Sequence, residues 1–177
     1  MSTHAAAHPP KRVEKLHQQP WRARARVSRA LRQHLDAQGH VTPHFTWAEF
    51  GCHDPHKTPV PKELRANTIR LAWLLEKLRH DLGDVAMSID SGYRTVAYNA
   101  QVGGAQDSRH THADAADFFS EQVDRWVKEG TARNRAEVLK IADRIFANGG
   151  LGNENSGTLH VDARQFKARF VTWMAAK

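Results

Sequence analysis

Residues 108–117 read Ser-Arg-His-Thr-His-Ala-Asp-Ala-Ala-Asp, a polar stretch that runs into the short apolar segment Ala115–Phe119. A short apolar segment behind a polar loop predicts a strand, and Asp117 lies near its start. Further along, residues 158–162 read Thr-Leu-His-Val-Asp and predict a second strand over Leu159–Ala163. If the two strands are neighbours in one sheet, they bring polar side chains from distant parts of the chain together.

Three side chains in these segments form a candidate set of metal ligands: His110, Asp117 and His160. Two imidazoles and one carboxylate, with a fourth position left open, are typical of a catalytic zinc site. Structural zinc sites are closed by four ligands, usually thiolates, and the single cysteine of this chain excludes a cysteine-rich site. Asp162 lies two residues after His160 and therefore points to the same face of the strand.

Hydrophobic periodicity predicts further elements around these two strands. In the longest predicted helix, apolar or small residues recur at spacings of three and four: Leu64, Thr68, Leu71, Leu75, Leu78 and Leu82. The alternation of Val85, Met87 and Ile89 predicts a third strand. The other predicted helices span residues 45–50, with a Thr46 cap, 95–102, 120–126 and 134–146, the last with a capping box at Asn134 and Glu137. Because the connections are too irregular for a doubly wound sheet, the expected class is α+β, a small antiparallel sheet flanked by helices.

The positive charge of the chain is concentrated at one end. Residues 1–40 hold eight Lys or Arg against Glu14 and Asp36, which is +6 of the formal net charge of +7. We therefore expect a basic, partly helical arm over residues 1–40 and one domain over residues 41–177. The arm suits a solvated tail, or an anchor for an anionic cell-wall polymer or a membrane surface. Nucleic-acid binding is not expected, because Trp21 is the arm's only aromatic residue.

The sequence predicts no membrane span and no signal peptide. A single cysteine excludes an intrachain disulfide, so the fold does not depend on oxidation. We expect a monomer made in the cytoplasm, and any action on a cell wall would follow phage lysis or delivery by a virion.

Six ordered motifs resemble the zinc D-Ala-D-Ala carboxypeptidase family of murein peptidases, which shares its fold with the hedgehog signalling domain. They are Ser91-Gly92-Tyr93-Arg94-Thr95, Tyr98-Asn99, Val102-Gly103-Gly104-Ala105, Ser108-x-His110 through Asp117, Gly149-Gly150-Leu151-Gly152 and His160-Val161-Asp162. The likeness runs from about Phe45 to Arg164. It leaves out the arm and the last segment of the chain.

The resemblance implies a hydrolase of peptidoglycan stem peptides with one Zn²⁺ ion held by His110, Asp117 and His160. Arg94 would contact a substrate carboxylate or the developing oxyanion, a task that suits a guanidinium. Ser108 would touch the substrate. Tyr93, in the same motif as Arg94, is expected at the substrate-binding surface.

Three departures from the family pattern affect these expectations. Ala113 replaces a glycine, which costs on the order of 1 kcal/mol if the position needs a positive φ. His112 offers an alternative zinc ligand. Several relatives place an acidic residue where this chain has Gly157, so the general base would be Asp162 or Glu154, and Asp162 could instead orient His160.

The predicted function is a zinc-dependent peptidoglycan peptidase, with D,D-carboxypeptidase or endopeptidase activity expected first. An L-Ala-D-Glu endopeptidase of the phage-lysin type is the enzymatic alternative. A zinc-containing module that binds the cell wall without cleaving it is the non-enzymatic alternative. Cys52, His53 and His56 have a loosely metal-like spacing, which leaves a second metal site open.

Overall fold

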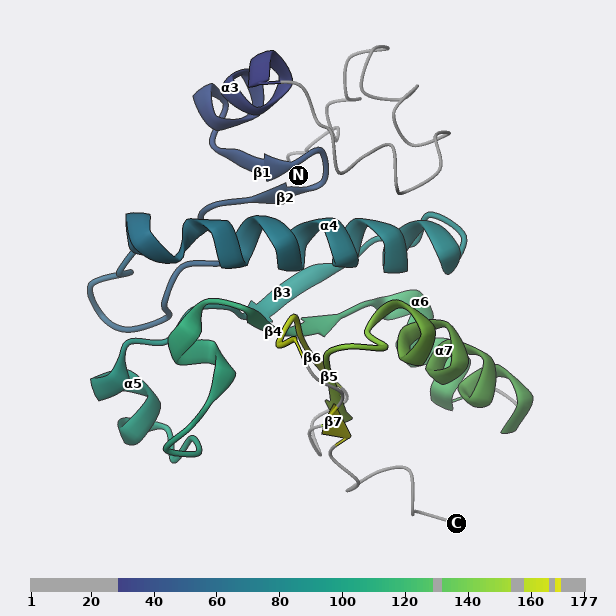
Figure 1. The fold of residues 1–177 in the computed structure, drawn as a ribbon. Coiled ribbons are helices and arrows are strands. Elements are labelled where there is room, and N and C mark those ends of the chain that lie inside the picture. Colours follow the sequence, from purple (N-terminus) through teal and green to yellow (C-terminus); the bar gives the residue numbers. More distant parts are fainter. Residues whose placement is uncertain (1–28, 129–131, 154–157, 166–167, 170–177) are drawn as a thin grey trace, which may run out of the picture.

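The structure is a computed structural model, and it describes residues 29–128, 132–153, 158–165 and 168–169. The order of its elements is α3 (Arg29–Ala37), β1 (His40–Thr42), β2 (Phe45–Thr46), η1 (Lys62–Leu64), α4 (Arg65–Asp81), β3 (Ser88–Ser91), α5 (Val96–Gln101), η2 (Arg109–His112), β4 (Ala115–Phe119), α6 (Glu121–Lys128), α7 (Ala132–Ile145), β5 (Gly150–Asn153), β6 (Leu159–Asp162) and β7 (Ala168–Arg169). The long helix α4 lies between the β1–β2 hairpin and the main sheet (Figure 1).

The main sheet has five strands in the order β3-β4-β6-β5-β7. Its four larger strands pair antiparallel, and the two-residue β7 pairs parallel with β5. In the register of β4 with β6, Asp117 lies opposite His160. Because residues directly opposite on antiparallel strands hold their Cβ atoms about 5 Å apart, this register alone brings two predicted metal ligands together. The predicted α+β class is confirmed.

Helix α4 supplies much of the hydrophobic core, as its spacing predicts. Thr68, Leu71, Leu75 and Leu78 are buried, and Gly83 (φ +92°) follows the last turn. The opposite side of the core comes from the sheet and from α7: Ala116, Phe118, Val138, Phe146, Leu151 and Val161. The strands that carry Asp117 and His160 are thus anchored on a packed apolar layer, which holds their polar ends in fixed positions.

Some of the predicted helices and strands are confirmed, and others differ from the structure. Strand 115–119 and the helix capped by Thr95 form as predicted, with Tyr98 N donating to Thr95 Oγ1 at 3.1 Å. The helix expected over residues 45–50 is wrong, because the chain pairs as β2 and then turns. Thr46 does bond locally, but with Glu49 Oε2, which accepts from its N and Oγ1 at 2.7 Å. Helix α7 begins at Ala132, ahead of the cap expected at Asn134.

The sequence did not predict strand β5, which begins at Gly150, only a few residues after helix α7 ends. Gly150 has a packing role: a Cβ on it would lie 2.0 Å from Asp162 Oδ2. The third predicted strand also begins later than expected, at Ser88, and Val85 is buried outside it. The division between an arm and a domain at residue 40 stays a prediction. Residues 1–28 lie outside the described part, and Leu35 of α3 is buried.

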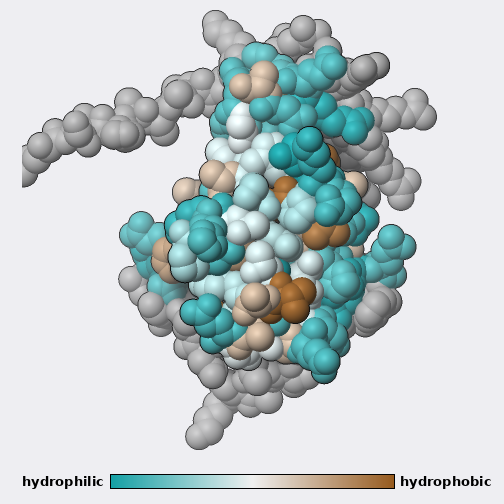
Figure 2. Space-filling view, turned by 90° about the vertical axis from the view of Figure 1, so that its left-hand side faces the viewer, coloured by the Kyte–Doolittle hydropathy of each residue, from teal (hydrophilic) through white to brown (hydrophobic). Residues whose placement is uncertain are grey.

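The surface in Figure 2 is mostly hydrophilic or neutral, with separate brown spots instead of one continuous apolar area. The large hydrophobic side chains exposed in the described residues are Val96 and Val102, both at α5. Among the described helices, none is both long and apolar enough to cross a membrane.

Glu76 makes the hairpin-to-helix contact sensitive to pH. It is fully buried on α4, and its carboxylate accepts from His44 N at 2.9 Å and lies 2.9 Å from His44 Nδ1. Burial acts to raise the pKa of Glu76, but the hydrogen bonds and charge of His44 outweigh it, so this pKa lies below its ordinary value of 4.5. The unfolded chain therefore binds the proton more readily, and the stabilisation is present above pH 4.5 and lost as pH falls through the folded pKa.

Urea unfolding of the wild type and Glu76→Gln, between about pH 7 and about pH 3, checks this expectation. The wild type should be more stable near neutral pH, and the difference should shrink in acid. A difference in unfolding free energy that stays constant over the whole range would contradict the assignment.

Ala113 adopts the positive φ that the sequence analysis considered. Its φ of 54° ends η2 in the left-handed region, which costs a residue with a Cβ about 1 kcal/mol. Ala113→Gly should therefore raise the free energy of unfolding by roughly 0.5–1 kcal/mol, the relief being partly offset by the greater freedom of glycine in the unfolded chain. Thermal or chemical unfolding measures this, and a less stable variant would show that the buried methyl group matters more than the strain.

Candidate metal centre

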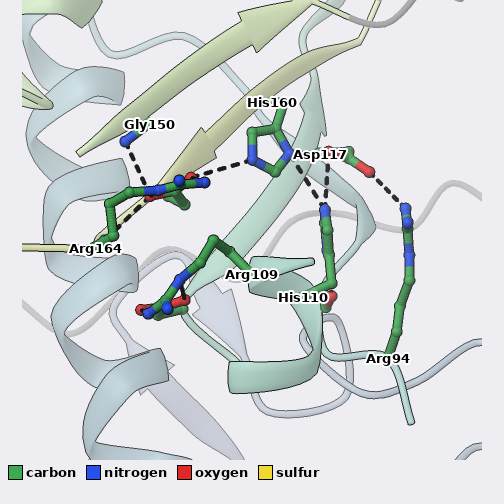
Figure 3. A network of polar contacts seen from close by, with 10 residues as sticks. Arg94, Arg109, His110, Asp117, Gly150, His160 and Arg164 are labelled. Carbon is green, nitrogen blue, oxygen red and sulfur yellow. Dashed lines mark hydrogen bonds and ion pairs between the residues drawn. The ribbon is translucent and has the colours of Figure 1, made fainter. Parts of the chain in front are cut away.

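Three polar atoms converge where β4 and β6 meet the loop that contains η2 (Figure 3). His110 Nε2 lies 3.2 Å from His160 Nδ1 and 3.2 Å from Asp117 Oδ1, and His160 Nδ1 lies 2.8 Å from the same oxygen. In a tetrahedral zinc site with bonds of 2.0–2.1 Å, neighbouring ligand atoms are about 3.3 Å apart. The triangle therefore has the size and the donor types of three zinc ligands.

Each of the three side chains is held by a second contact on its far side. His110 Nδ1 donates to Gly92 O at 2.6 Å, since a carbonyl can only accept, and this leaves the Nε2 lone pair facing the other ligands. His160 Nε2 lies 3.4 Å from Asp162 Oδ2, which leaves Nδ1 toward the centre. The outer oxygen of Asp117 accepts from Arg94 Nη2 at 2.8 Å. Such outer contacts fix the orientation of metal ligands.

The carboxylates of Asp117 and Asp162 favour positive charge at His160. Burial acts to raise the pKa of Asp117, but hydrogen bonds from His110 and His160 outweigh it and hold this pKa well below its ordinary range. For His160, burial acts to lower the pKa, while hydrogen bonds to Asp117 and Asp162 raise it to about 9. Asp117 is therefore ionised at neutral pH and provides a full negative charge at the centre.

Asp162 is fully buried, and both of its oxygens are occupied. Arg164 donates to them from Nε at 2.7 Å and from Nη2 at 2.6 Å, and Gly150 N donates to Oδ1 at 2.9 Å. Burial acts to raise the pKa of Asp162, but the hydrogen bonds with His160 and Arg164 and the charge of Arg164 outweigh it and hold this pKa well below its ordinary range. A carboxylate so engaged is a poor proton acceptor, so the contacts favour the orienting role of Asp162 over the role of general base. Glu154 and Gly157 lie outside the described residues.

A cavity of about 350 Å³ opens beside the three ligands. Arg94 and Ser108 line it, together with His110 and His160. Arg94 also donates from Nε to Ser91 Oγ at 2.9 Å, and its side chain is 15% exposed. Tyr93 is not among the lining residues and packs against the hydrophobic core, so its contact with substrate stays a prediction.

Several residues that form this cavity were not predicted to belong to the site. Arg109 lines it while pairing with the fully buried Asp114, to which its Nε donates at 3.0 Å. Arg164 and Asp107 line it as well. The position of Arg164, two residues after the His160-Val161-Asp162 motif, could have indicated that it belongs to the site. The pairing of Arg109 with Asp114 could not have been predicted, because no repeating sequence pattern indicates it.

His112 and Cys52 do not join the centre. His112 is exposed, and the described residues hold no other cluster of three metal-ligating side chains, so Cys52, His53 and His56 form no second site there.

Comparison with known proteins agrees with the geometry. The family model described as Peptidase M15 matches residues 43–162. The chain belongs to the peptidase M15 family. A zinc D-Ala-D-Ala carboxypeptidase from Streptomyces albus G is 43% identical over 54 residues, which is 30% of this chain and 21% of that protein. The match thus spans about a fifth of that relative's length. The predicted family is confirmed. The predicted zinc cofactor is supported by the family, by the name of this relative and by the convergence of His110, Asp117 and His160.

Proposed function

We propose that this chain is a zinc-dependent peptidase that hydrolyses amide bonds in the stem peptides of peptidoglycan. The observation that carries the proposal is the triangle of His110, Asp117 and His160 beside a cavity lined by Arg94 and Ser108. Membership of the peptidase M15 family and the name of the Streptomyces relative support it.

His110, Asp117 and His160 would hold the ion, and two of these residues, His110 and His160, also line the cavity. A zinc ion bound in this way polarises a scissile carbonyl and lowers the pKa of a coordinated water to about 7. Gly92 and Asp162 keep the two imidazoles in the tautomers that coordination requires.

Arg94 connects the ligands to the substrate. Its Nη2 and Nε donate to Asp117 and Ser91, while Nη1 has no partner among the described residues and belongs to a side chain that lines the cavity. These remaining N–H groups suit a substrate carboxylate or the oxyanion that forms during amide hydrolysis. Ser108 lines the same cavity and has a hydroxyl for a peptide group.

A D,D-carboxypeptidase or endopeptidase is the favoured activity, because the relative named for D-Ala-D-Ala cleavage supports that branch. The protein would act as a monomer on the cell wall, after phage lysis or delivery by a virion. The basic arm would contact an anionic wall polymer or membrane surface.

Mass spectrometry of digested muropeptides tests the proposal. Pentapeptide monomers and cross-linked dimers would be incubated with the zinc-loaded protein and with His110→Ala. We expect loss of one terminal D-Ala, or splitting of dimers, with the wild type only. Cleavage after the first L-Ala would move the activity to the phage-lysin type. Binding to murein without any product from a protein that holds one zinc would instead indicate a wall-binding module.

A further inference from the structure

A second cavity, of about 410 Å³, lies apart from the metal centre. Its lining combines apolar groups, among them the buried Cys52 and Val60 and the half-buried Trp47, with three basic side chains. No acidic side chain of the described residues lines it. A cavity with an apolar floor and basic groups suits a ligand that joins an anionic group to an apolar or ring-shaped body.

The three basic side chains are His53, Lys57 and Arg65. All three are exposed, and none forms an ion pair with an acidic side chain in the described part of the chain. The other cavity differs in this respect, because there Arg94, Arg109 and Arg164 are each paired with an aspartate. Unpaired cations beside an apolar floor attract an anion without first giving up an internal partner.

The Arg65 side chain is held in place before any ligand binds, and the backbone of Lys57 is fixed by a turn. The Arg65 guanidinium lies 4.9 Å from the centroid of the Trp47 ring, and the indole Nε1 donates to Asp36 of α3 at 2.9 Å. Lys57 has a φ of 50°, a conformation rare for a residue with a side chain, and its N donates to Asp54 O at 3.0 Å. Backbone strain of this kind is often retained where it positions a functional group.

The cavity also borders the loop that carries Arg94. Thr95 N lies 3.5 Å from Cys52 Sγ, and Tyr93 N donates to Phe50 O at 2.8 Å. The segment that lines the second cavity is therefore bonded to the residues on both sides of Arg94. The loop thus links Arg94 at the metal centre to the segment that contains Cys52 and His53 of the second cavity.

We propose that this cavity is a subsite for an oxyanion, a carboxylate or a phosphate group, of the wall polymer whose peptide occupies the metal centre. The assignment of the polymer rests on the proposed function. The oxyanion lies against Arg65 and Lys57, while the body that bears it packs on Trp47 and Val60. The carboxylate source is the peptide part of murein, and the phosphate source is an anionic polymer attached to it.

Co-sedimentation with insoluble murein tests the subsite in the full chain. The double variant Lys57→Gln/Arg65→Gln removes two charges at the cavity, and Lys62→Gln/Arg125→Gln removes two exposed charges elsewhere. We expect the cavity variant to bind roughly tenfold more weakly, since charge-assisted hydrogen bonds are lost, and the control to bind nearly as the wild type does. An equal loss of murein affinity in both double variants would overturn the proposal, because it would show that the net charge of the protein determines binding.

To identify the source of the oxyanion, the same co-sedimentation would be repeated with murein from which the phosphate polymer has been removed. If the difference between the two variants disappears when the polymer is removed, the ligand is phosphate. If it persists, the ligand is a peptide carboxylate.

A titration of the wild type with inorganic phosphate, followed by NMR, avoids the question of whether the variant folds. The indole N–H signal of Trp47, assigned with Trp47→Phe, and the amides of Lys57 and Arg65 should shift. The absence of shifts at these positions would overturn the proposal. Neither measurement requires cleavage, so a failed subsite is distinguishable from a failed peptidase.

Discussion

Replacing His110 with alanine should abolish tight zinc binding and lower the rate of peptide hydrolysis at least about a thousandfold, because the metal supplies several kcal/mol of stabilisation to such reactions. His110 is 2% exposed, and its Nε2 lies 3.2 Å from ligand atoms of both Asp117 and His160. Its removal leaves two protein ligands, one fewer than catalytic zinc sites use.

His112→Ala is the matched control for this prediction. His112 lies in the same loop but is exposed and outside the cluster. Zinc affinity would be measured by competition with a chromogenic chelator, and far-ultraviolet circular dichroism would check that both variants fold. Loss of zinc from His112→Ala, with affinity retained in His110→Ala, would show that the wrong imidazole has been assigned to the centre.

Replacing Asp162 should weaken zinc binding although Asp162 is not a ligand. Asp162 is fully buried, and its carboxylate accepts hydrogen bonds from Arg164 Nη2 and Gly150 N. The same carboxylate orients His160 by its contact with Nε2. Outer-contact residues of this kind typically contribute a factor of 10–100 in metal affinity, and we expect about that loss in Asp162→Asn. Asp162→Ala should in addition lower the free energy of unfolding by about 3–5 kcal/mol, because it leaves the partly buried guanidinium of Arg164 without its carboxylate.

Zinc affinity and turnover at saturating zinc separate the two roles considered for Asp162. An orienting residue alters the affinity, and part of the activity returns when zinc is in excess. If Asp162→Asn kept the wild-type affinity and lost only turnover, Asp162 would be the general base and the orienting role would be wrong.

The sequence predicted those elements whose formation depends on residues close together in the chain. Helix α4 was predicted because its apolar residues recur every three or four positions, and the helix at Val96 because Thr95 caps it. The helix expected over residues 45–50 failed because Thr46 and Glu49, a plausible helical start, bond to each other within a turn while Phe45 pairs with Thr42. The choice between these states depends on a strand partner, which periodicity does not reveal.

The same division applies to the site. The convergence of His110, Asp117 and His160 was predictable because their residue types and spacing match a motif with a known chemistry. The engagement of Asp162 by Arg164 and Gly150 was not, because it depends on how β5 lies beside β6 and on a glycine that leaves room for a carboxylate. The second cavity depends on Arg65 stacking over Trp47, two residues 18 positions apart that belong to no shared motif.

The most direct test of the central claim is the release of new amino groups from isolated murein, measured together with the zinc content of the protein. The account predicts release by the wild type that holds one zinc per chain, loss of release when a chelator removes the metal, recovery when zinc is restored, and none from His110→Ala. A wild-type protein that holds one zinc per chain and releases no amino groups from murein would contradict it.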